Sequence, residues 1–154
     1  MNIDELISFI GHTSTSDKFV DFLHENGIKK VPKGDSTVRI ASPDKKISLE
    51  FSPTDDFNRK SLKPALGSGW FAFRSLDVHK GFNGVLPFGL SFDLKKNEID
   101  AMLGMVLAGE HGSVETHYKS PYLVVVFFND KKTAVETFRF IIPDKYHYNN
   151  LKIQ

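Results

Sequence analysis

The sequence predicts an α+β fold, an antiparallel sheet with helices packed on one face. Its 154 residues are 40% hydrophobic and include 14 phenylalanines, enough to bury a core without disulfides. Apolar residues follow helical spacing in some segments and period-two alternation in others. The two kinds of segment recur in a similar order in both halves of the chain. This order predicts two tandem helix-strand-strand-strand modules.

We expect a single domain over residues 1–154. Module one spans about residues 1–80, module two about residues 84–142, and a polar tail occupies residues 143–154. The alternative is an ordinary α+β domain in which the similarity between the halves is coincidental.

Module one should open with two short helices. Apolar residues at i, i+3, i+4 and i+7 predict the first helix over residues 2–10, with Asn2 as its N-cap. The second should bury Phe19, Phe22 and Leu23 and end at the Asn-Gly pair 26–27.

Period-two alternation, bounded by turn residues, predicts the strands. The expected strands are 36–41, 46–51, 70–78, 114–119, 121–128 and 133–142. The segment YLVVVFF, at 122–128, is apolar at every position and is typical of a central strand covered on both faces. In the last strand Phe138, Phe140 and Ile142 should point inward.

Residues 84–104 should form a turn, an extended apolar segment and a helix that begins at Asp93 and ends at Gly104. The apolar triplets of the two module helices lie 80 positions apart: Phe19, Phe22 and Leu23 precede Ile99, Met102 and Leu103. We expect the core to contain Phe22, Leu23, Leu49, Phe51, Phe73, Leu103, Val124, Val126, Phe138 and Phe140.

The charge of the chain argues against nucleic-acid and membrane partners. Its net charge is +1, with acidic and basic residues intermixed, so no basic footprint is visible. The absence of cysteine excludes disulfides and thiolate chemistry. The N-terminal residues do not resemble a signal peptide, and no apolar run reaches the roughly 20 residues of a spanning helix. We expect a soluble, cytoplasmic protein.

No common catalytic motif occurs in the sequence, so we expect neither an enzyme nor a cofactor. The adjacent carboxylates Asp55 and Asp56 should solvate a polar connector over residues 52–69, which is either a binding loop or a mobile one. His111, Glu115 and His117 could converge on a metal. Their spacing matches no standard zinc pattern, however, and we expect surface polar residues and no metal site.

Several segments together resemble a group of small bacterial immunity proteins. They are ISFIGHTSTSDKFVDFL, ISLEF, GVLPFGLSFDLKKNEIDAMLG and YLVVVFF, and the resemblance covers roughly residues 5–142. Such proteins are encoded beside polymorphic toxins, including those of contact-dependent growth inhibition systems. The plan of tandem modules is also similar to that of β-lactamase inhibitor proteins. Immunity proteins against nucleases are often acidic, and this near-neutral chain departs from that pattern.

The resemblance implies a protein that binds and neutralises a cognate toxin domain, as a monomer or in a 1:1 complex. The alternative is a small-ligand-binding or unfamiliar enzymatic α+β domain. An inhibitor needs an exposed patch with aromatic residues at its centre and polar groups at its rim. From position in the expected loops and tail, the candidate contact residues are Asp55, Asp56, Phe57, Glu110, Glu115, Tyr146 and Tyr148. Acidic residues there would suit a partner with a basic cleft.

Overall fold

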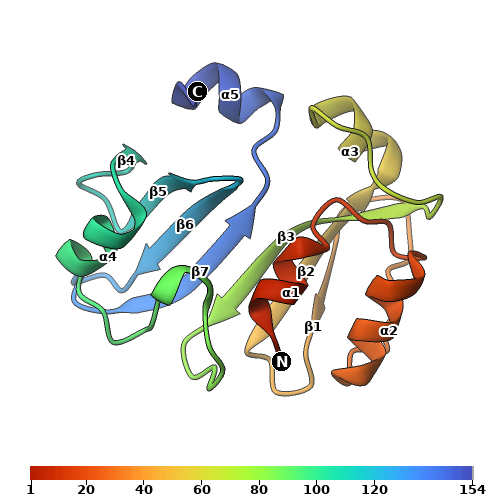
Figure 1. Ribbon diagram of the computed structural model, residues 1–154, viewed down its shortest axis with the longest axis horizontal. Coiled ribbons are helices and arrows are strands. Elements are labelled where there is room, and N and C mark those ends of the chain that lie inside the picture. The colour runs from red at the N-terminus through yellow and green to blue at the C-terminus, as the bar shows by residue number, and fades with distance from the viewer. Residues whose placement is uncertain (154) are drawn as a thin grey trace.

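The computed structural model describes residues 1–153, which form helices packed on one antiparallel sheet (Figure 1). The strands are β1 (Val38–Ala41), β2 (Ile47–Pro53), β3 (Phe71–His79), β4 (Val106–Ala108), β5 (Val114–Lys119), β6 (Tyr122–Phe128) and β7 (Val135–Ile141). The helices are α1 (Ile3–Ser8), α2 (Asp17–Glu25), α3 (Thr54–Lys60), α4 (Lys96–Leu103) and α5 (Lys145–Leu151), with a 3-10 turn, η1, at Pro87–Gly89. The predicted α+β class is confirmed.

Each half of the chain contributes neighbouring strands to the sheet. The order is β1-β2-β3-β7-β6-β5-β4, and all adjacent strands are antiparallel. The halves therefore meet where β3 pairs with β7. The element order of the halves differs in detail, because α3 lies between β2 and β3 and the short β4 precedes β5. The equivalence of the two modules stays a prediction.

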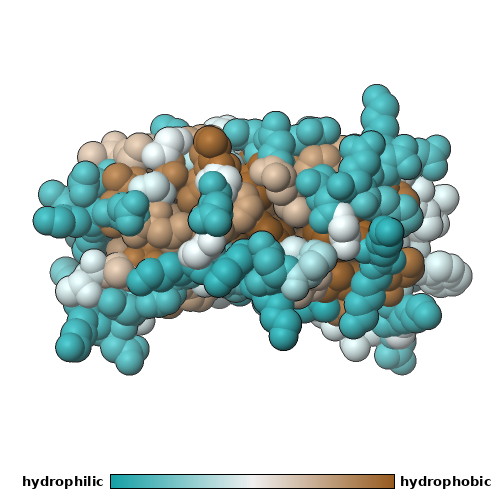
Figure 2. All heavy atoms as spheres, turned by 90° about the horizontal axis from the view of Figure 1, so that it is seen from below, coloured by the Kyte–Doolittle hydropathy of each residue, from teal (hydrophilic) through white to brown (hydrophobic). Residues whose placement is uncertain are grey.

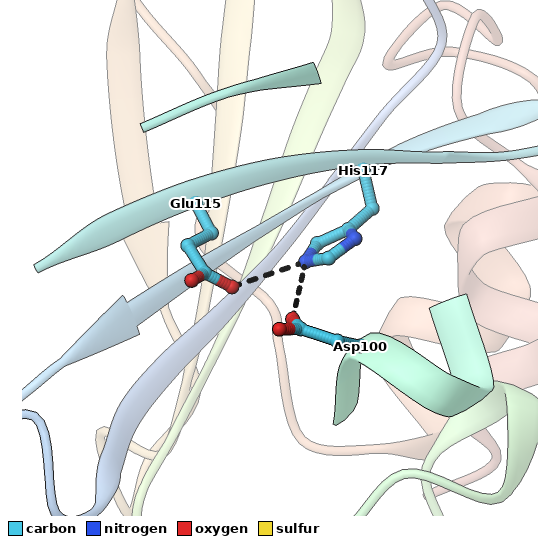
Figure 3. Close-up of side chains that lie close together, drawn as sticks. All are labelled: Asp100, Glu115 and His117. Atoms are coloured by element: carbon cyan, nitrogen blue, oxygen red, sulfur yellow. Dashed lines mark hydrogen bonds and ion pairs between the residues drawn. The ribbon is translucent and has the colours of Figure 1, made fainter. Parts of the chain in front are cut away.

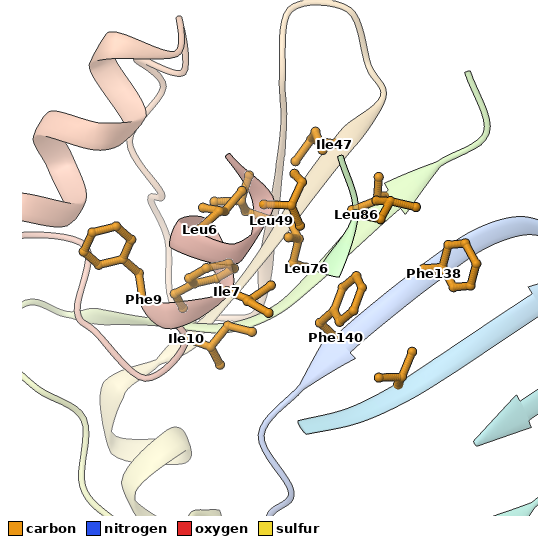
Figure 4. Close-up of a cluster of buried hydrophobic side chains, with 14 of the residues drawn as sticks. Leu6, Ile7, Phe9, Ile10, Ile47, Leu49, Leu76, Leu86, Phe138 and Phe140 are labelled. Atoms are coloured by element: carbon orange, nitrogen blue, oxygen red, sulfur yellow. The ribbon is translucent and has the colours of Figure 1, made fainter. Parts of the chain in front are cut away.

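The core lies between the sheet and the helices α1, α2 and α4, which cover the face turned to the viewer in Figure 1. All ten expected core residues are buried. Leu6 and Ile7 of α1, and Ile10 just after the helix, point toward the sheet, where the side chains of β2, β3 and β7 meet them (Figure 4). Phe19 of α2 stacks between Phe9 and Phe73, with ring centroids 5.2 and 5.1 Å apart. Such aromatic pairs add to the free energy gained from burial alone.

The first two helices follow their sequence signals. The Asn2 side chain accepts a hydrogen bond from the Glu5 amide at 3.1 Å, which satisfies a free donor of α1. Helix α2 ends at Glu25, Asn26 is its C-cap, and Gly27 follows with φ +78°. This left-handed conformation costs glycine nothing, so the predicted stop is confirmed.

An ion-pair network occupies the opposite face of the sheet, where β3 meets β7. The Asp77 carboxylate accepts two hydrogen bonds from Arg139 of β7, at 2.7 and 2.9 Å. Arg39 of β1 lies 3.2 Å from the same carboxylate and 2.7 Å from Glu50 of β2. This network links strands from both halves of the chain.

Several sequence-based expectations about elements are wrong. Residues 54–60 and 145–151 are helices, not a connector and a tail, and β4 lies in a segment for which no strand is predicted. The segment before α4 contains η1, in which Phe88 has φ +61°, so it is a turn and not an extended segment. Helix α4 begins after Lys95, whose amide donates to Glu98 at 3.0 Å, and not at Asp93.

Two expectations about burial also need correction. Ile142 lies just past the end of β7 and is exposed, because the strand stops at Ile141. Strand β6 is not fully covered on both faces, since Val125 and Phe127 are only half-buried on the face away from the helices.

Seen from below, hydrophobic surface toward the middle of the molecule is interrupted by polar side chains (Figure 2). Within residues 1–153, none of the helices has the length and apolar character needed to cross a membrane.

Candidate functional site

Three predicted contact residues lie on α3, which projects beyond the sheet at the upper edge of Figure 1. Asp55 is exposed, and Asp56 forms an ion pair with Arg59 one turn later. Phe57 is half-buried, and its ring approaches Gly11 on the segment after α1. The expectation of an exposed Phe57 in a loop is therefore corrected, because the helix turns this ring inward.

Residues 61–70 connect α3 to β3 and are fixed by backbone hydrogen bonds. Leu66 donates to the Gly11 carbonyl and accepts from the Thr13 amide, both at 2.9 Å. The Thr54 hydroxyl donates to the Gly69 carbonyl at 2.6 Å, and its amide donates to the Trp70 carbonyl at 2.9 Å. A loop held at its middle and at its C-terminal end in this way has little backbone freedom left to lose on binding.

Trp70 ends this loop, and 86% of its surface is exposed. Its indole borders an open hollow of about 250 Å³, which is also lined by Asp55 and by Gly67, Ser68 and Gly69. Leu62 and Leu66 in the same loop are exposed as well. Tryptophan is enriched among the residues that dominate binding energy at protein interfaces, so an exposed indole on a fixed loop is a candidate anchor.

Helix α5 lies beside α3, and the Lys145 ammonium donates to the Arg59 carbonyl at 3.2 Å. A groove of about 520 Å³ lies between the helices, lined by Arg59, Lys60, Arg74, Asp144, Lys145, Tyr146 and His147. Tyr146 is 67% exposed at this groove. Basic side chains outnumber acidic ones, so the groove is opposite in sign to the acidic surface expected from Asp55 and Asp56. We call α3, the loop to Trp70 and α5 together the α3–α5 surface.

The remaining predicted contact residues, Tyr148, Glu110 and Glu115, differ in exposure and in position relative to this surface. Tyr148 is partly buried; burial and a hydrogen bond with Tyr118 of β5 raise the pKa of its phenol. Glu110 is exposed, but it lies in the turn between β4 and β5, at the edge of the sheet away from β1. Glu115 is completely buried in β5. The prediction that Glu115 contacts a partner is therefore wrong, because its side chain lies on the helix-facing side of β5 and is covered by α4.

Glu115 belongs to a buried polar cluster between α4 and β5 (Figure 3). His117, two residues along the same face of β5, is also fully buried. Its Nε2 atom lies 3.3 Å from Glu115 Oε2 and 3.6 Å from Asp100 Oδ1 of α4. Its Nδ1 atom lies 3.0 Å from the Gly104 carbonyl, which can only accept, so Nδ1 carries a proton.

Lys96 completes the cluster from the first turn of α4. Its ammonium lies 2.8 Å from Glu115 Oε1 and 2.9 Å from Asp100 Oδ2. These contacts, led by the one with Glu115, raise the pKa of Lys96 above its usual range, so the side chain stays charged. Of the three residues considered from sequence as metal ligands, Glu115 and His117 converge, whereas His111 lies on an exposed turn. The expectation that Glu115 and His117 are surface residues is wrong.

Sequence reasoning missed Trp70 and Asp100. Trp70 is the only tryptophan of the chain and follows a Gly-Ser-Gly turn, on the opposite side of the strand from Phe71. Its position after the turn and its position on the side opposite Phe71 are the two sequence signals that it is exposed. Asp100 lies next to Ile99 on a helix whose apolar residues face the sheet, and only the crossing of α4 over β5 brings it to His117. No spacing rule predicts that contact.

Comparison with known proteins places no constraint on this chain. No protein-family model, no curated protein and no solved structure matches it. Membership of the immunity-protein group, which the sequence resemblance implies, therefore stays a prediction.

Proposed function

We propose that this chain is a cytoplasmic immunity protein that binds and neutralises the toxin domain of a polymorphic toxin. The toxin would be the C-terminal domain of a contact-dependent inhibition effector, with nuclease activity as one candidate. The proposal rests on the resemblance of the sequence segments to that group, and the exposed Trp70 supports a protein-binding role. An indole left in water on a fixed loop gains free energy when a partner covers it.

The α3–α5 surface is the proposed contact region. Trp70 and Tyr146 supply aromatic anchors beside the first and the last turn of α3, respectively. Asp55, Lys60 and Lys145 supply a polar rim. This combination of apolar centre and charged rim is common at protein interfaces. Because the groove between α3 and α5 is basic, we expect the facing surface of the partner to be acidic there and apolar opposite Trp70.

The experiment measures affinity for the toxin domain encoded by the neighbouring reading frame. Trp70→Ala and Tyr146→Ala should each weaken binding by about 30-fold or more, as expected for anchors at an interface. Val85→Ala is the matched control, because Val85 is an exposed apolar residue between β3 and η1, outside the α3–α5 surface. All three variants should melt like the wild type, since each side chain is mostly exposed.

Failure to bind or inhibit that toxin domain would contradict the proposed function. If toxin binding is unchanged in Trp70→Ala and Tyr146→Ala but is lost on substitution outside the α3–α5 surface, the proposed function stands and the proposed contact region is rejected.

A further inference from the structure

We propose that Asp100, Glu115 and His117 bind a divalent transition-metal ion, with Zn²⁺ as the best-fitting candidate. This inference is independent of the proposed function, and it replaces the sequence-based expectation that the chain has no metal site. It follows from the positions of the three side chains, from the groups that hold their outer atoms, and from an opening to solvent beside them.

The first step is the direction of the His117 lone pair. Because Nδ1 donates to the Gly104 carbonyl, a neutral imidazole has its lone pair on Nε2. That atom faces two carboxylate oxygens, Glu115 Oε2 and Asp100 Oδ1, which offer it no proton. Three electron-rich atoms thus point at one another inside the protein, an arrangement that a cation between them stabilises.

The second step is the spacing of these atoms. An imidazolium that only hydrogen-bonds a carboxylate places nitrogen and oxygen about 2.7–2.9 Å apart. Here the nitrogen lies 3.3 Å from Glu115 Oε2 and 3.6 Å from Asp100 Oδ1, the latter too long for a hydrogen bond. Zinc–ligand bonds of about 2.0–2.2 Å at tetrahedral angles separate neighbouring ligand atoms by about 3.3–3.5 Å. The shorter separation is a long hydrogen bond, the longer one is not a hydrogen bond, and both are close to the spacing of shared coordination.

The third step is the set of outer contacts. Lys96 holds Glu115 Oε1 and Asp100 Oδ2, the carboxylate oxygens other than those nearest His117. The Gly104 carbonyl holds His117 through Nδ1. Metal-binding histidines usually donate their second nitrogen to such an acceptor, and ligating carboxylates are likewise hydrogen-bonded. All three proposed ligands are therefore oriented through atoms other than the three inner ones, and among the inner atoms His117 Nε2 and Glu115 Oε2 lie within hydrogen-bond range of each other.

Two further observations agree with an ion at this position. Asp100 Oδ1 is buried and has no hydrogen-bond partner among residues 1–153. The three candidate ligand atoms lie within 4.8 Å of one another, which is wider than the spacing of shared coordination, so binding requires one side chain to move inward. Asp100 also has a partly exposed side chain and can adjust its position, whereas Glu115 and His117 are fixed in β5.

An opening to solvent gives the ion a route of entry. A hollow of about 450 Å³ is lined by Lys95, Lys96, Asn97, Asp100, Lys132 and Thr133. Asp100 thus contributes both to the hollow and to the buried triad. Three protein ligands leave a fourth tetrahedral position for water or for an anion. The lysines that border the hollow favour an anion.

The test is titration of chelator-treated protein with ZnCl₂, followed by calorimetry and by thermal melting. We expect one Zn²⁺ per chain. At a free Zn²⁺ concentration about 100 times the Kd, the Tm should rise by about 5–10 °C. Mg²⁺ and Ca²⁺, which require six or more oxygen ligands, should produce neither signal.

Ligand variants distinguish this site from binding at surface histidines. Asp100→Asn and Glu115→Gln should each weaken Zn²⁺ binding by about 100-fold or more. Substitution of a group that only hydrogen-bonds a metal ligand costs about 10–100-fold in affinity, and loss of a ligand itself should cost at least the larger of these values. His111→Gln is the matched control, because His111 is exposed on a neighbouring turn, and it should bind like the wild type. Asp100 is partly exposed, so Asp100→Asn keeps the test valid even if Glu115→Gln fails to fold. Absence of one-to-one binding, or binding unchanged in Asp100→Asn, would overturn the proposal and leave a buried ion-pair network.

Discussion

Val126 shows how closely a single position is constrained in this fold. It is fully buried on the helix-facing side of β6, opposite Glu115 of β5 and Phe138 of β7. A charged group at this position would lose its hydration and would lie directly beside a buried carboxylate. Like charges at opposed positions of neighbouring strands are destabilising.

Val126→Asp should therefore unfold the protein or lower its free energy of unfolding by several kcal/mol, out of a usual total of about 5–15 kcal/mol. Val125→Asp is the control on the other face of the same strand, where Val125 is half-buried and lies opposite Arg139. We expect it to change stability by about 1 kcal/mol or less. Urea unfolding of both variants provides the comparison, and equal stability of the two would contradict the assigned faces of β6.

At this scale the apolar residues could be predicted and the buried polar residues could not. Alternation alone identified the inward face of the phenylalanine-rich strands, because one face carries only apolar groups. In β5, by contrast, polar residues lie on both faces, so alternation gives no sign that Glu115 and His117 point inward. The burial of Glu115 depends on Lys96 of α4, whose ammonium group offsets the charge of its carboxylate.

Among the elements, α3 and α5 escaped prediction because neither contains a buried residue. A helix without a buried face lacks the apolar spacing on which sequence reasoning depends. The remaining sequence signals for these two helices are the capping and charged residues at their ends. Asp144 accepts a hydrogen bond from the His147 amide at the start of α5, at 3.0 Å, and α3 carries acidic residues in its first turn and basic ones in its last. Long elements with a buried face, such as α2 and β3, were found because they bury apolar side chains.

The loop between α3 and β3 offers a test of how Trp70 is held in place. Gly67 has φ +108°, and a Cβ atom at this position would collide with the Thr13 hydroxyl. Gly67→Ala should lower the free energy of unfolding by more than Gly34→Ala, in which φ is +104° but no atom lies within 4 Å. Both variants carry the cost of a left-handed residue, about 1–2 kcal/mol, and only Gly67→Ala adds a steric cost of about 1–3 kcal/mol.

Chemical denaturation of both glycine variants measures the difference. Equal losses in the two would show that the added Cβ atom does not collide with Thr13 and would contradict the close packing of the loop on it.

For the molecule as a whole, the junction of β3 and β7 joins the two halves of the chain. Asp77 there accepts paired hydrogen bonds from Arg139 and also lies beside Arg39. Asp77→Asn would leave these guanidinium groups without a full counter-charge. We expect a loss of about 2–3 kcal/mol in the free energy of unfolding, less than for a fully buried pair because Arg139 is partly exposed.

Asp56→Asn is the matched control for that prediction, since the Asp56–Arg59 pair is exposed on α3. It should cost less than about 1 kcal/mol. Thermal and urea unfolding of both variants give the comparison, and a loss at Asp56 as large as that at Asp77 would refute the role assigned to the junction.

The central claim is that a cognate toxin domain covers the α3–α5 surface, and Trp70 reports on it directly because the chain has only one tryptophan. Protein labelled with 5-fluorotryptophan should therefore give a single ¹⁹F NMR signal from this side chain. Titration with the unlabelled toxin domain should shift and broaden that signal as the indole leaves water, reaching saturation at one toxin domain per chain. A stable complex, verified by its mass in solution, in which the ¹⁹F signal stays unchanged would contradict the claim.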